Sequence, residues 1–85
     1  MVEDEQFGWV LEHFRVVWVV EPLQDGTWTA RYCWRPGIDH DASRALHDDV
    51  LNGKSRRLRG VYTTETETVT AIQQAILLEA RWSRR

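Results

Sequence analysis

The chain has 85 residues, of which 42% are hydrophobic and five are tryptophan, so we expect one small domain, residues 1–85, with its own core. Its single cysteine excludes an internal disulfide and suits a reducing compartment. The net charge of −2 is unlike that of a strongly basic nucleic-acid domain, and no apolar run approaches the roughly 18 residues of a membrane span. We therefore expect a cytoplasmic protein without a membrane segment.

The first predicted element is a short helix that ends near residue 14. Four apolar residues recur at the spacing of one helical face: Phe7, Val10, Leu11 and Phe14. Asp4 precedes them and can cap the first turn.

A β-hairpin follows, with strands near 14–21 and 27–35. Gln24-Asp25-Gly26 is typical of a three-residue loop closed by a left-handed glycine. That turn predicts a register with one wholly apolar face: Val16, Trp18, Val20, Ala30, Tyr32 and Trp34. The other face carries Val17, Val19, Glu21, Thr29, Arg31 and Cys33. A shift by one residue would mix the two sets, and Pro36-Gly37 ends the second strand.

The segment 38–53 allows two interpretations. One is a helix capped by Asp41 and ended by Asn52-Gly53, whose apolar side comprises Ala42, Ala45, Leu46 and Val50. The other is a long ordered loop. Residues 58–63 then predict a third strand, with Leu58, Gly60 and Tyr62 on one side and Arg57, Arg59 and Val61 on the other.

The last helix begins at Thr64-Glu65-Thr66-Glu67, which fits a capping box. Its predicted apolar arc, which includes Leu78 and excludes Leu77, comprises Val69, Ala71, Ile72, Ala75, Ile76, Leu78, Ala80 and Trp82, with Glu79 falling inside it. Together these elements predict an α+β fold, a three-stranded antiparallel sheet with helices packed on one face, in the order α-β-β-(α)-β-α.

Residues suited to catalysis or metal binding are few. His40 and His47 lie about 10 Å apart along a helix, too far to share one ion, and no HExxH or CxxC spacing occurs. Cys33 lies within a strand without a base beside it, and Ser43 lacks a nucleophile elbow. We expect no enzymatic activity, no metal, no cofactor and no small-molecule substrate.

The densest positive charge lies in the basic block, Lys54, Arg56, Arg57 and Arg59. With Tyr62 nearby, this block combines phosphate-binding cations with an aromatic ring for stacking. The predicted order of elements resembles the double-stranded RNA-binding domain family, which places lysines at the start of its last helix. Here those positions hold Glu65 and Glu67, which would repel phosphates.

Residues 14–35, and more loosely 58–80, resemble the HicB antitoxin core. The similarity rests on a strand, the turn Asp25-Gly26 followed by Trp28 and Ala30, a strand ending in Pro36-Gly37, and a last helix that begins with threonine. This chain has a longer connection at 38–57 and Thr70-Ala71 in place of Glu-Ala. The resemblance implies a toxin-neutralising or partner-capping role without catalysis.

We therefore expect a small regulator or inhibitor, antitoxin-like or of the phage-inhibitor type, that binds a partner protein or forms a homodimer. The predicted contact residues come from the second hairpin face and the basic block: Val17, Val19, Arg31, Cys33, Lys54, Arg56, Arg57 and Arg59. Nucleic-acid binding through residues 54–59 is the alternative.

Overall fold

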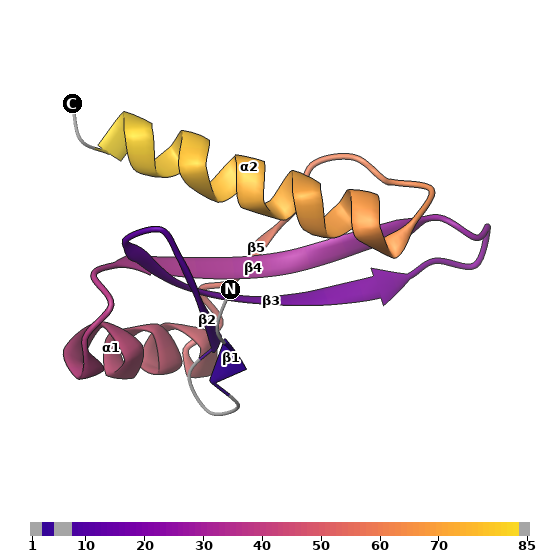
Figure 1. Cartoon of the computed structure of the whole chain (residues 1–85). Coiled ribbons are helices and arrows are strands. Elements are labelled where there is room, and N and C mark those ends of the chain that lie inside the picture. The colour runs from indigo at the N-terminus through magenta and orange to yellow at the C-terminus, as the bar shows by residue number, and fades with distance from the viewer. Residues whose placement is uncertain (1–2, 5–7, 84–85) are drawn as a thin grey trace.

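The computed structural model describes residues 3–4 and 8–83, and it consists of an antiparallel sheet between two helices (Figure 1). The sheet order follows the chain: β1 (Glu3–Asp4), β2 (Gly8–Leu11), β3 (Phe14–Pro22), β4 (Trp28–Pro36) and β5 (Arg56–Arg57). The helices are α1 (His40–Leu51) and α2 (Glu65–Ser83). The α+β class is confirmed, whereas the three-stranded sheet and its order of elements are wrong.

The central hairpin, β3 and β4, has the predicted register. Val16 pairs with Trp34, Trp18 with Tyr32 and Val20 with Ala30. The loop is also as predicted, since Gly26 has φ +86° and its N–H donates to the carbonyl of Leu23. The alternation of apolar and polar residues and the residues of the turn were sufficient to predict this register, because both signals depend on neighbouring residues alone.

The segment predicted as the first helix is a strand. Gly8–Leu11 forms β2, which pairs with the start of β3 through a tight turn at Glu12 and His13. Asp4 belongs to β1 instead of capping a helix, and Phe7 lies outside the described residues. An isolated helix of this length is marginal in water, and pairing with β3 satisfies the backbone of both strands.

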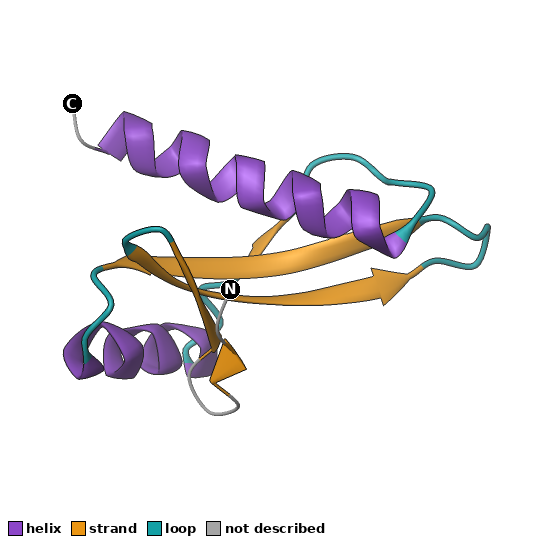
Figure 2. Ribbon diagram, in the orientation of Figure 1, coloured by secondary structure: helices purple, strands orange, loops and turns teal. Residues whose placement is uncertain are grey.

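The two helices cover opposite faces of the sheet, so the predicted packing on one face is wrong (Figure 2). Both helices contact β3 and β4, and this pair of strands, about 10 Å wide, leaves room for one helix of about 10 Å on each face. α2 covers the wholly apolar face. α1 packs below the other face, where buried Leu46 and Asp49 lie on its sheet-facing side.

Of the two interpretations of residues 38–53, the helix is correct, but its cap is Asp39. The Asp39 carboxylate accepts a hydrogen bond from the Ala42 backbone N–H at 2.9 Å, and the helix ends at Asn52 before left-handed Gly53. Asp41 lies in the first turn, where its charge favours the helix dipole.

The predicted third strand is shorter and shifted. β5 contains only Arg56 and Arg57, after which the Leu58 N–H donates to the Ala30 carbonyl and Tyr62 forms an isolated bridge with Trp28. The predicted alternation is seen only at Arg57, which pairs with Arg31, and at buried Leu58, because Gly60, predicted on the same side as Leu58, is exposed. Gly60, with φ +80°, interrupts the ladder between the two contacts.

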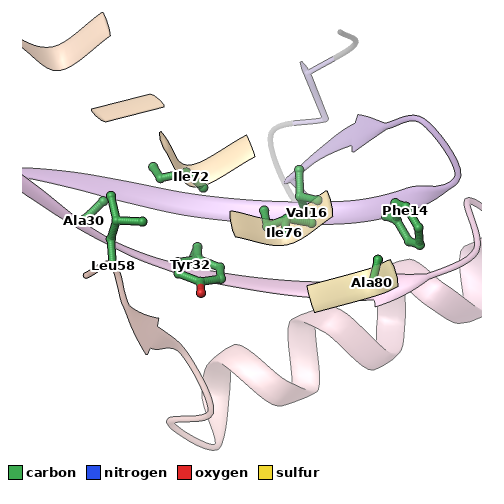
Figure 3. Packing of buried hydrophobic residues seen from close by; sticks show 8 residues of the cluster. All are labelled: Phe14, Val16, Ala30, Tyr32, Leu58, Ile72, Ile76 and Ala80. Carbon is green, nitrogen blue, oxygen red and sulfur yellow. The ribbon is translucent and has the colours of Figure 1, made fainter. Parts of the chain in front are cut away.

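α2 completes the core. Thr64 caps it through the Glu67 N–H, and the Glu67 carboxylate bonds Thr63. The buried side chains gather between α2 and the hairpin (Figure 3): Phe14, Val16, Ala30, Tyr32, Leu58, Ile72, Ile76 and Ala80. The predicted arc is wrong at Leu77, which packs against this core, and at Leu78 and Trp82, which are 56% and 63% exposed.

Candidate binding groove beside the last helix

α2 presents two stripes of side chains to its surroundings. One stripe, spaced by four residues, enters the core and comprises Thr68, Ile72, Ile76 and Ala80. The second lies along its flank and comprises Ala71, Gln74, Ala75 and Leu78. The i, i+3, i+4, i+7 spacing of this second set places it on one face. That face forms one wall of a groove.

The opposite wall comes from β5 and the segment that follows it. Arg56, Arg57, Leu58, Arg59 and Tyr62 line the groove, whose volume is about 580 Å³. We call this site the basic groove. Its apolar surface comes from both walls, and three arginine residues belong to one of them. A mixed lining of this kind provides both apolar contact and electrostatic orientation for a ligand.

Three hydrogen-bonded side chains, those of Tyr32, Glu79 and Arg56, lie at one end of the basic groove. The Tyr32 hydroxyl donates to Glu79 Oε2 at 2.6 Å, and Arg56 donates to Glu79 Oε1. Burial, followed by the hydrogen bond to Glu79, raises the pKa of Tyr32 to about 12. These contacts explain how Glu79 is accommodated within the predicted apolar arc. The charge of Arg56 is therefore already paired with a carboxylate of this same chain.

The other two arginines of the groove have no such partner. Arg57 and Arg59 are exposed, and neither forms an ion pair with a side chain of residues 10–82. Arg31 is exposed as well and stands opposite Arg57 in the β4–β5 register. Because cross-strand partners share a face, the side chains of Arg31 and Arg57 leave the sheet on the face away from α2, whereas Arg59 follows the end of β5.

Lys54 and Cys33 lie at a different place, beside α1. Asp49 binds Arg35 at 2.6 Å and 3.0 Å, and Lys54 Nζ lies 3.6 Å from the same carboxylate. Arg35 holds the pKa of Asp49 below its ordinary value. Burial, and then the charge of Asp49, raises the pKa of the buried Cys33 thiol, so this thiol is poorly disposed to ionise.

The hairpin face predicted to be uncovered is only partly open. Cys33 and Thr29 are buried, Val17 is half-buried, and Val19 is 60% exposed. α1 packs against both β3 and β4, which explains why the face is not open over its whole length. The eight predicted contact residues therefore do not form one surface.

Sequence reasoning missed the α2 wall of the groove. Gln74 and Leu78 carry no motif, and Leu78 was assigned to the core because it fits the helical apolar arc. The second stripe of α2 was a signal available in the sequence. Assigning it to a groove required knowing where β5 lies.

Two other features of the described chain bear on function. Within residues 3–4 and 8–83, His, Cys, Asp and Glu side chains form no group of three that could hold a metal ion. Neither helix, over the same ranges, combines the length and apolar character that crossing a membrane requires.

Comparison with known proteins adds no assignment: no family model, curated protein sequence or solved structure matches this chain significantly.

Proposed function

We propose that this protein is a non-enzymatic interaction module, a regulator or inhibitor that acts by binding a partner protein. The supporting observation is the basic groove, in which exposed Arg59 borders an apolar surface that ends at exposed Leu78. Arginine beside apolar side chains is typical of residues that contribute strongly to protein interfaces.

Nucleic-acid binding is the second candidate, because Arg31 lies opposite Arg57 and adds a third exposed cation. Two features favour a protein partner. Tyr62 packs against the core and its hydroxyl donates to the Arg59 carbonyl at 3.2 Å, so its ring is not an open stacking surface. The chain also carries a net charge of −2.

Site-specific crosslinking tests this function. A photo-crosslinking amino acid replaces Leu78 in the groove or, as the matched control, Leu51 on α1, which is 71% exposed. In the cell that makes the protein, we expect a crosslinked polypeptide from position 78 and not from position 51. Crosslinks to nucleic acid, equal crosslinks from both positions, or none from either would contradict the proposal.

A further inference from the structure

We infer that the basic groove binds a short acidic segment of the partner, with a carboxylate that meets Arg59 and an aliphatic side chain that packs beside Leu78. This inference rests on the proposed function and names the chemistry of its ligand. It depends on the charges, the apolar surface and the length of the groove.

The charges of the groove favour an anionic ligand. Arg56 is already bound to Glu79, whereas Arg59 forms no ion pair with a side chain of residues 10–82. Guanidinium groups bind carboxylates through two parallel hydrogen bonds, which gives direction as well as attraction. A carboxylate of the ligand would therefore pair with Arg59 on this wall.

The apolar surface requires more than charge from the ligand. Leu78 is 56% exposed, and Ala71 and Ala75 line the same wall. Covering such surface releases water from apolar groups on both partners, which a purely ionic ligand cannot do. An aliphatic side chain between the acidic residues meets this requirement, and it distinguishes a protein segment from a nucleic-acid backbone.

The length of the groove indicates the size of the segment. Ala71 and Leu78 are seven residues apart on α2, which corresponds to about 10 Å along the helix axis. An extended chain advances about 3.3 Å per residue, so about three to four residues span this distance. A volume of about 580 Å³ lies in the range of sites that hold small ligands.

A synthetic peptide provides the test. The probe is a fluorophore-labelled acetyl-Asp-Glu-Leu-Glu-Asp-amide, and its controls replace leucine with serine or both glutamates with glutamine. Backbone amide chemical shifts of the full chain locate the site, and anisotropy follows the affinity. We expect saturable shifts confined to residues 56–62 and 71–79, with a Kd below about 1 mM. Each control peptide should bind more weakly.

Variants of the protein carry the decisive comparison. Arg59→Glu should weaken binding about tenfold or more, whereas Arg44→Glu, an exposed charge on α1, should change it less than about twofold. Leu78→Ser should weaken binding, and the matched Leu51→Ser should not. Raising the salt concentration from about 0.05 M to about 0.5 M should weaken the ionic contribution to peptide binding.

The outcomes separate this inference from the proposed function. Absent binding, shifts elsewhere in the chain, or equal affinity of the paired variants would refute the acidic ligand. If position 78 still crosslinks a protein in the cell, the proposed function survives that result. If duplex DNA or RNA binds instead and the charge reversal at Arg59 abolishes it, both proposals fail.

Discussion

The contact between Asp49 and Arg35 should be a main reason why α1 docks on the face away from α2. Asp49 is 8% exposed and accepts two hydrogen bonds from Arg35, at 2.6 Å and 3.0 Å. Hydrogen bonds to charged groups contribute about 1.5–3 kcal/mol, and the partial exposure of Arg35 reduces this value. We therefore expect Asp49→Asn to lower the free energy of unfolding by about 1–2 kcal/mol.

Urea denaturation at neutral pH measures this effect, with a midpoint shift of about 1–2 M if the slope is about 1 kcal/mol per molar. The matched control is Asp48→Asn, an exposed carboxylate on the same helix. Removing that charge near the helix C-terminus should leave stability unchanged or raise it. Equal shifts for the two variants, or additivity of Asp49→Asn with Arg35→Gln in a double-mutant cycle, would refute the assigned contact.

The pH dependence of the same contact has a definite sign. The native pKa of Asp49 is depressed, so its contribution is fully present above the unfolded value of about 3.9 and is lost as the pH falls through the native pKa. The stability difference between the wild type and Asp49→Asn should therefore be constant near neutral pH and shrink below about pH 4. A difference that persists unchanged in acid would point to packing instead.

Three further predictions concern the core and the groove. Ile76→Ala should destabilise the protein by about 2–5 kcal/mol, against less than about 0.5 kcal/mol for exposed Val61→Ala, and equal urea midpoints would contradict the packing. Ser43→Ala should raise the urea midpoint, because the buried Ser43 hydroxyl has no hydrogen-bond partner among the described residues, and a loss of stability would show that it has one. Tyr32 should resist ionisation in ultraviolet titration until about pH 12, and a normal titration would refute its burial and its bond to Glu79. Since burial and then this bond raise its pKa, the stabilising contribution of neutral Tyr32 should be complete below about pH 10 and be lost as pH rises towards 12.

The sequence by itself determined those features that depend on neighbouring residues. The register of β3 and β4 followed from alternation around Gly26, and the start of α2 followed from the cap at Thr64. Both signals lie within a few residues of the structure they specify. Local backbone chemistry and a period of two or 3.6 residues are therefore sufficient to read them.

Only the tertiary structure decided which surfaces meet. Phe14 completes an apparent helical stripe, yet its strand pairing turns the preceding residues into β2. Asp49 looks like a surface acid until α1 crosses below the sheet and meets Arg35. Leu78 fits a core pattern, but the sheet beneath α2 covers only one of the helix's two stripes of side chains, and Leu78 lies on the other. These outcomes depend on long-range competition for a limited area of sheet, which no local pattern in the chain records.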